Sequence, residues 1–275
     1  EGIEAISDYA FQACANLESV SIPSSIRVVG AAPFQYCTSL TTIVVDKTNP
    51  IFDSREGCNA IIKTKDNSLI VGCGATKIPS SVRCIDKYAF MGCLVEELAI
   101  PDGVERINFF AFSSCLNLKK IVIPASVETI EELAFDNCPE VISIVVDKNN
   151  TDYDSRNGCD AIIYTSDNKL ILGCSSTIIP QDIETISAFA FSHCRNLQSS
   201  VIPEGVSCIA AGAFEYCSSL KEVILPTTLE SFIGGSNFGY CTSLEGITIP
   251  KGVCNMESDL FCGCISLQKI SVDSA

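Results

Sequence analysis

The sequence is short of histidine, of basic side chains and of long apolar runs, and each shortage excludes a class of protein. His193 is the only histidine, so a Ser-His-Asp or Cys-His catalytic set would have to depend on this one residue. Eighteen basic side chains against 33 acidic ones give a net charge of −15, which repels nucleic acid and anionic membrane surfaces. No apolar run approaches the roughly 20 residues that span a bilayer. We therefore expect no nucleic-acid partner, no transmembrane segment and no enzymatic activity.

Motifs for cofactors and metals are also lacking. The sequence has no P-loop, no GxGxxG turn and no HExxH helix, so it predicts no cofactor. A structural zinc site needs four ligands, commonly as two cysteine pairs, but Cys262 and Cys264 have no second pair nearby. We expect no metal site.

Two acidic pairs are the nearest approach to a calcium site, because that ion prefers oxygen ligands. The pairs are Asp46 with Asp53, and Asp147 with Asp154. Arg55 and Arg156 follow closely and can pair with these carboxylates. Asx turns supported by arginine are therefore favoured over calcium binding.

The chain instead consists almost entirely of an internal repeat, which is clearest between Ile107 and Pro124. A phenylalanine recurs every 22 to 24 residues, apart from two intervals of 56, and a cysteine follows each phenylalanine by three positions. These phenylalanines are Phe11, Phe34, Phe90, Phe112, Phe135, Phe191, Phe214, Phe238 and Phe261. One such unit cannot bury its own apolar face, but stacked units can, so the period predicts a solenoid.

Each unit predicts one strand and one turn. Ile121 and Ile123 alternate with other residues and precede Pro124, which is typical of a short, half-buried parallel strand that ends at the proline. Phe112 and Cys115 are three residues apart among small or polar neighbours, which favours a single helical or 3₁₀ turn. With 47% hydrophobic residues, the chain can fill the continuous core that stacking creates.

Two units are longer, at residues 46–79 and 147–180. Each contains two apolar runs around an Asp-Asn turn, at Asp66-Asn67 and Asp167-Asn168, which predicts a β-hairpin. Because Cys73 falls where Leu118 stands in its own unit, we interpret each long unit as a repeat that has lost its Phe and Cys turn and gained a hairpin.

The 17 cysteines are best explained as core residues. Nine of them occupy the same position of the repeat, three residues after the phenylalanine, where a small apolar thiol would fill one space in a stack. An odd total leaves at least one thiol unpaired. A second possibility stays open in the hairpins, where Cys58 with Cys73, and Cys159 with Cys174, are predicted to lie close enough for a disulfide. We favour reduced thiols there.

The pattern A-F-x-x-C-x-x-L-x-x-I-x-I-P-x-x-V-x-x-I, seen complete from Ala111 to Ile130, resembles the leucine-rich repeats of the Treponema pallidum type found in BspA-like surface proteins. Residues 46–62 and 147–163 resemble a variant common in gut Bacteroidetes. The resemblance implies an α/β leucine-rich repeat solenoid in a single domain over residues 1–275. We expect a right-handed curved rod of about ten to eleven rungs with short parallel strands, helical or 3₁₀ turns and two β-hairpin insertions.

Some repeats depart from this pattern. Ser200 stands in an apolar strand position, the repeat around Val95 is one residue short, and Gly234-Gly235 interrupt another, so these should be the least regular rungs. The chain starts within a repeat and ends just after Val272, without a polar capping unit or a signal peptide. We therefore expect exposed apolar edges, and a segment or mature form of a longer protein.

Outward positions of the strands are the first candidate site. If Ile121 and Ile123 face the core, Lys120 and Val122 face outward, and the equivalent residues form two columns along the stack. Apolar residues in the second column are either the β-branched residues favoured in any strand or an exposed patch for binding. The candidate face comprises Lys120, Val122, Val145, Val201, Glu222 and Ile224. The hairpins are a second candidate surface, with Phe52, Tyr153 and Tyr164 to present.

The resemblance implies secretion or display on a cell surface and adhesion to host proteins or other cells; fibronectin and fibrinogen are the ligands associated with the family name. We accordingly expect a non-catalytic, extracellular or cell-surface module that binds a protein, such as a host extracellular matrix or plasma protein. The alternative is a structural spacer solenoid that displays another domain and has no ligand of its own.

Overall fold

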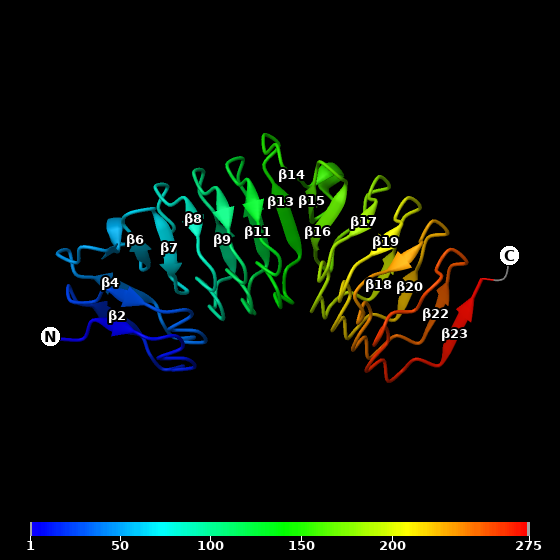
Figure 1. Cartoon of the computed structure of the whole chain (residues 1–275), viewed down its shortest axis with the longest axis horizontal. Coiled ribbons are helices and arrows are strands. Elements are labelled where there is room, and N and C mark those ends of the chain that lie inside the picture. The colour runs from blue at the N-terminus through cyan, green and yellow to red at the C-terminus, as the bar shows by residue number, and fades with distance from the viewer. Residues whose placement is uncertain (1, 274–275) are drawn as a thin grey trace. The chain divides into compact units, whose positions relative to one another are not determined.

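The computed structural model describes residues 2–273, which form a leucine-rich repeat solenoid as predicted (Figure 1). It has about 12 turns, here called rungs, slightly more than expected. The chain divides into two compact units, Glu1–Leu118 with Val122–Cys138, and Lys119–Ile121 with Pro139–Ala275. A single domain over residues 1–275 stays a prediction. Within residues 2–273, no helix has the length and apolar character needed to cross a membrane.

Short strands make up nearly all the regular structure. The first twelve are β1 (Ala5–Ile6), β2 (Ser19–Ile22), β3 (Val28–Val29), β4 (Thr42–Val45), β5 (Phe52–Asp53), β6 (Ile61–Lys63), β7 (Ser68–Val71), β8 (Cys84–Ile85), β9 (Glu97–Ala99), β10 (Arg106–Ile107), β11 (Lys120–Ile123) and β12 (Thr129–Ile130). The others are β13 (Ser143–Val146), β14 (Tyr153–Asp154), β15 (Ala161–Tyr164), β16 (Lys169–Gly173), β17 (Thr185–Ile186), β18 (Ser199–Val201), β19 (Cys208–Ile209), β20 (Glu222–Ile224), β21 (Ser231–Phe232), β22 (Gly246–Ile249) and β23 (Lys269–Val272).

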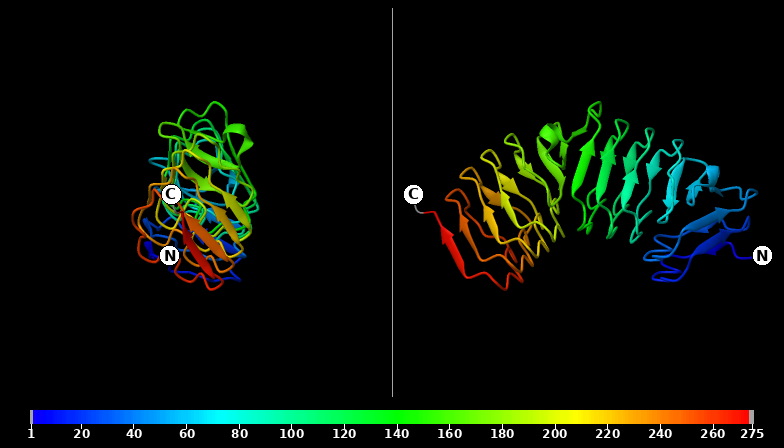
Figure 2. Two further views of the ribbon diagram at one scale, coloured as in Figure 1. Left: turned by 90° about the vertical axis from the view of Figure 1, so that its right-hand side faces the viewer. Right: turned by 180° about the vertical axis from the view of Figure 1, so that it is seen from behind.

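Equivalent strands of neighbouring rungs pair in parallel, because each repeat makes one full turn of the solenoid and returns the chain in the same direction. In the first unit β2 pairs with β4, and in the second β18 pairs with β20 and β22 with β23. A second line of two-residue strands runs through each unit, for example β8 with β10 and β17 with β19 (Figure 2). A regular rung such as the one with β10 and β11 therefore contributes one strand of the longer kind and one of the shorter kind.

The turn after the second strand is not helical, which corrects the prediction. Cys115 N–H donates to the Phe112 carbonyl at 3.4 Å and Leu118 N–H to the Cys115 carbonyl at 3.1 Å, but Ser114 between them has φ +58°. The N–H groups of Phe112 and Ser114 instead donate to the next rung, to Ala134 at 2.8 Å and Asp136 at 2.9 Å. Backbone donors used between rungs are not free to continue a helix. The 3₁₀ helices described are η1 (Arg55–Gly57) and η2 (Arg156–Gly158), both in the long rungs.

The phenylalanines form a stack in the core of each unit. Phe112 is fully buried, with its ring centroid 4.9 Å from that of Phe90 and 5.2 Å from that of Phe135. In the second unit Phe214 lies between Phe191 at 4.8 Å and Phe238 at 5.4 Å. Their recurrence in sequence is thus the signature of rungs stacked on a shared core within each unit.

The cysteines beside this stack are core thiols with a hydrogen-bonding role that the sequence did not reveal. The Cys115 thiol donates to the Phe90 carbonyl of the preceding rung at 3.3 Å, and the Cys217 thiol donates to the Phe191 carbonyl at 3.1 Å. A carbonyl has two lone pairs, so a buried thiol can satisfy the one that the backbone leaves free. This explains why cysteine, rather than alanine, suits the position.

All 17 cysteines are free thiols, and most of them should be unreactive in the folded chain. Burial raises the pKa of Cys93 and of Cys217, which keeps both thiols protonated at neutral pH. We expect Ellman's reagent to label the exposed Cys14, Cys254 and Cys262 within the first minutes, and all 17 thiols after denaturation without a reductant. A total below 17 in the denatured chain would contradict this and indicate a disulfide such as Cys58 with Cys73.

The two long rungs contain the predicted hairpins, with one additional strand each. Strands β6 and β7 are antiparallel, and β5 adds to the other edge of β6; β15, β16 and β14 repeat this arrangement in the second unit. Gly72 takes the place of the missing phenylalanine, because its N–H donates to the Ala89 carbonyl at 2.7 Å as the N–H of Phe112 does to Ala134. The Phe90 ring lies over Gly72, in the space that a side chain would occupy.

Of the rungs expected to be irregular, the one with Gly234-Gly235 shows how the core adapts. Both glycines have positive φ, at 80° and 74°. Asn237 stands where other rungs have alanine before phenylalanine, and it is fully buried. Its Nδ2 donates to the Ile209 carbonyl at 2.9 Å and to the Ala210 carbonyl at 2.7 Å, so the side-chain amide ties this rung to the preceding one in addition to the backbone bonds that both carbonyls accept.

Candidate functional site

The outward positions of β18 and β20 form an apolar and acidic surface in the second unit. Val201 pairs with Ile224, and Ser199 pairs with Glu222, in a parallel register. Val201 is 64% exposed and Ile224 is 51% exposed, whereas Val223 between the outward residues is 5% exposed. The predicted alternation is therefore correct here, and two bulky apolar side chains face solvent side by side.

The other predicted face residues lie elsewhere. Lys120 is exposed and Val122 is half-buried, both on β11. Val145 on β13 is 42% exposed, but β13 does not belong to the sheet of β18 and β20. Of the six predicted residues, the structure thus brings together Val201, Glu222 and Ile224.

Ile178 is an outward apolar residue that the sequence reasoning missed. It is 77% exposed and precedes Ile179-Pro180 as Val122 precedes Ile123-Pro124, so it holds the same position in its rung. The signal was present in the alignment of the long unit with its neighbours.

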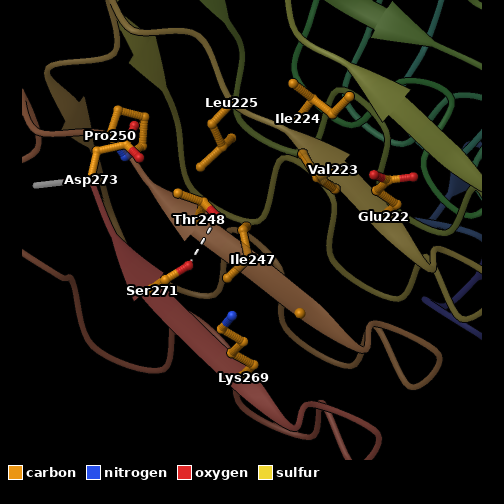
Figure 3. Close-up of a pocket in the computed structure, with 11 residues that line it drawn as sticks. Glu222, Val223, Ile224, Leu225, Ile247, Thr248, Pro250, Lys269, Ser271 and Asp273 are labelled. Carbon is orange, nitrogen blue, oxygen red and sulfur yellow. Dashed lines mark hydrogen bonds between the residues drawn. The ribbon is translucent and has the colours of Figure 1, made fainter.

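A hollow lies over β20, β22 and β23 at the C-terminal side of this surface (Figure 3). Its volume is about 420 Å³, and its lining includes Glu222, Ile224, Leu225, Gly246, Thr248 and Lys269. Strands β20 and β22 lie side by side, but no hydrogen-bond ladder joins them in the described structure. Gly246 contributes no side chain, which leaves the floor of the hollow open between the flanking residues.

The edge of the hollow carries polar groups with spare hydrogen-bonding capacity. Thr248 Oγ1 and Ser271 Oγ lie 3.0 Å apart on β22 and β23 (Figure 3). One hydroxyl donates to the other, so each retains acceptor capacity and one retains a donor. Glu222 and Lys269, on the two outer strands, are both exposed. The site therefore combines apolar side chains, hydroxyls and charges of both signs, which suits non-covalent recognition.

The predicted hairpin surface is wrong for two of its three residues. Phe52 is 2% exposed and Tyr153 is 5% exposed, because the additional strands β5 and β14 turn these rings into the core. Asn49 fixes the approach to β5, since its Oδ1 accepts from the N–H groups of Ile51 and Phe52 at 3.0 and 2.9 Å. Tyr164 is half-buried, with its ring centroid 5.5 Å from that of Tyr153.

The acidic residues of the hairpins have structural partners. Asp53 forms an ion pair with Arg55 at 2.6 Å, and Arg55 also donates to Asn67 Oδ1 at 2.8 Å, which ties the start of the hairpin to its turn. Asp46 accepts from the Thr48 N–H at 2.8 Å in an Asx turn. Between residues 2 and 273, no group of three or more His, Cys, Asp and Glu side chains is placed to hold a metal ion.

His193 is half-buried in a stack of aromatic rings. Its ring stacks on Tyr216 with the centroids 4.6 Å apart, and Tyr216 stacks on Tyr240 at 4.7 Å. The Nδ1 atom is buried without a hydrogen-bond partner among the described residues. Burial, and secondarily the charge of Arg195, lowers the pKa of His193 from 6.5 to about 4.

This shift predicts acid destabilisation. The unfolded chain binds a proton at His193 below pH 6.5 but the folded chain only below about 4, so the free energy of unfolding should fall as pH drops through that window. His193→Asn, with the side chain found at the equivalent Asn137, should reduce the difference in thermal midpoint between pH 7 and pH 5. An unchanged difference in the variant would exclude His193 as its source.

Comparison with known proteins places this architecture among bacterial repeat proteins. A family model described as BspA type leucine rich repeat region matches residues 1–58, 72–159 and 170–275 in six copies. No curated protein sequence matches the chain.

Among solved structures, a leucine-rich repeat protein from Eubacterium ventriosum has a TM-score of 0.67 and 23% identity, over 98% of this chain and 78% of that one. A leucine rich cell surface protein from Faecalibacterium prausnitzii has a TM-score of 0.58 and 23% identity, over 99% and 84%. The pneumococcal vaccine antigen PcpA has a TM-score of 0.55 and 18% identity, over 98% and 60%. At these identities the likeness concerns the fold.

Proposed function

Because the chain belongs to the family of BspA-type leucine rich repeat proteins, we propose that it is a non-catalytic module, secreted or displayed at a cell surface, that binds a partner protein. The binding surface is the outward face of β18, β20, β22 and β23. The partner is an extracellular protein of a host or of another cell. A role in adhesion follows from such binding.

The observation that carries the proposal is the pair Val201 and Ile224. These side chains are 64% and 51% exposed and lie side by side. A single exposed apolar side chain is ordinary on a protein surface, but adjacent ones form an apolar patch whose burial against a partner is favourable. Polar and charged residues border them, as they do at the rims of protein interfaces. The net charge of −15 further favours partners with a basic surface.

The test is binding of the full chain to a panel of purified extracellular matrix and plasma proteins, measured by surface plasmon resonance. The double variant Val201→Asp with Ile224→Asp should lose at least about tenfold in affinity for any protein bound, since it places charges in the centre of the interface. Its thermal midpoint should stay within a few degrees of the wild type, because both side chains are exposed.

Ile265→Asp is the control, because Ile265 is 84% exposed and lies in a turn, outside the strands of the proposed surface. It should bind as the wild type does. A double variant that retains full affinity would contradict the proposed surface. A wild-type chain that binds none of the panel would favour the spacer.

A further inference from the structure

Gly246 is a glycine that the backbone does not require. It has no positive φ, and a Cβ added to it would meet the Lys269 carbonyl oxygen at 3.4 Å and the Lys269 Cβ at 3.9 Å, which are ordinary contacts. Gly173, in contrast, lies under the Phe191 ring, where a Cβ would come within 2.1 Å of a ring carbon. A glycine inside a strand weakens it, and where packing does not demand it the position is typical of close approach by a ligand or another backbone.

Charges of opposite sign flank this glycine. Glu222 on β20 and Lys269 on β23 occupy the same outward column as Gly246, and Gly246 pairs directly with Lys269. Both charged side chains are exposed, and neither forms an ion pair within the described part of the chain. Gly246 and Lys269 are one ladder spacing of about 4.8 Å apart, and β20 lies beside β22 without a ladder, so the backbones of Glu222 and Lys269 are at least about 10 Å apart.

Building on the proposed function, we propose that the hollow over Gly246 binds an extended segment of the partner protein. The segment crosses β20, β22 and β23 and presents a basic side chain to Glu222 and an acidic side chain to Lys269. Its backbone passes over Gly246, within reach of the hydroxyls of Thr248 and Ser271, and its apolar residues contact Ile224.

The distance between the charges sets the spacing in the segment. In the polyproline II conformation, residues three positions apart lie on the same side and about 9 Å from each other. This is close to the spacing of the strands that carry Glu222 and Lys269, and their long side chains can cover the remainder, so the segment carries its basic and acidic residues at positions i and i+3. A neutral glycan would leave both charges without a counterpart, which is why a polypeptide is the occupant proposed.

The experiment measures the affinity of the full chain for short fluorescent peptides by polarisation. One peptide carries Arg and Asp three positions apart around Pro and Val; a second has the same composition with Arg and Asp adjacent; a third replaces them by Gln and Asn. The first should bind best, and its advantage should shrink in high salt. In the double variant Glu222→Gln with Lys269→Gln, the first and third peptides should bind equally.

Gly246→Ile is the decisive variant, because it fills the hollow without backbone strain. Binding of the first peptide should fall by at least about tenfold, while the thermal midpoint stays the same or rises, since isoleucine favours strands. Thr42→Ile makes a related change at the equivalent outward position of β4, which is exposed and outside the proposed binding surface, and should leave the affinity unchanged.

Equal binding of all three peptides, no binding of any, or full affinity in Gly246→Ile would overturn the inference. So would displacement of the first peptide by a neutral oligosaccharide. One further outcome is a partner protein that binds the Gly246→Ile variant normally and fails to bind the double variant Val201→Asp with Ile224→Asp. That result would refute the role of the hollow and leave the proposed function standing.

Discussion

Replacing Phe112 by alanine is expected to lower the free energy of unfolding by about 3–5 kcal/mol. The ring is fully buried and stacks on two others, with centroids 4.9 and 5.2 Å away, so its removal takes contacts from both neighbouring rungs. The surrounding rungs can close this space only in part, because each is fixed by hydrogen bonds to the next. Urea unfolding followed by circular dichroism measures the loss.

Phe261→Ala is the control for this prediction. Phe261 occupies the same position of the repeat, but it is only half-buried and has one stacked neighbour, Phe238, at 5.7 Å. Its replacement should cost clearly less than that of Phe112. Equal losses in the two variants would show that stacking within the core does not set the stability of a rung.

Alanine at Gly173 is expected to destabilise the second unit by about 1–3 kcal/mol or more, although it adds a single methyl group. That methyl carbon would lie 2.1 Å from a carbon of the Phe191 ring, far inside contact distance. The ring is 1% exposed and is held on its other side by Phe214, 4.8 Å away between ring centroids. Thermal unfolding of Gly173→Ala measures the effect.

A double-mutant cycle separates this clash from other effects of the substitution. In a Phe191→Ala background the ring is absent, so adding Gly173→Ala should cost much less than it does in the wild type. If the two costs are the same, Gly173 is required for some reason other than the space that Phe191 occupies.

Most of the scaffold could be predicted from the sequence because one period fixes it many times over. Phe112 and Cys115 recur with their equivalents in rung after rung, and only stacking in a common core explains such regularity. The hairpins could be predicted from their Asp-Asn turns. The turn at Ser114 could not, because apolar spacing does not reveal whether backbone N–H groups bond within a rung or to the next one.

The candidate site was less accessible from the sequence. The exposure of Val201 and Ile224 follows from strand alternation and was predicted. The burial of Phe52 and Tyr153 depends on the two-residue strands β5 and β14, which are too short to leave a periodic signal.

Strand alternation is enough to place Gly246 in the outward column, but the hollow above it depends on the side chains of three separate strands. Where these side chains lie depends on the register of the strands and on the fact that no hydrogen-bond ladder joins β20 to β22 in the described structure. Neither feature can be derived from a repeat pattern alone.

The most direct test of the account compares two adjacent residues of β20, Val223 and Ile224, each replaced by aspartate. The account predicts that Val223→Asp, at a position 5% exposed, loses several kcal/mol of stability. Ile224→Asp, at a position 51% exposed, should keep its thermal midpoint and lose affinity for the partner protein. Equal destabilisation by the two variants, or full affinity in Ile224→Asp, would contradict the assignment of inward residues to the scaffold and outward residues to recognition.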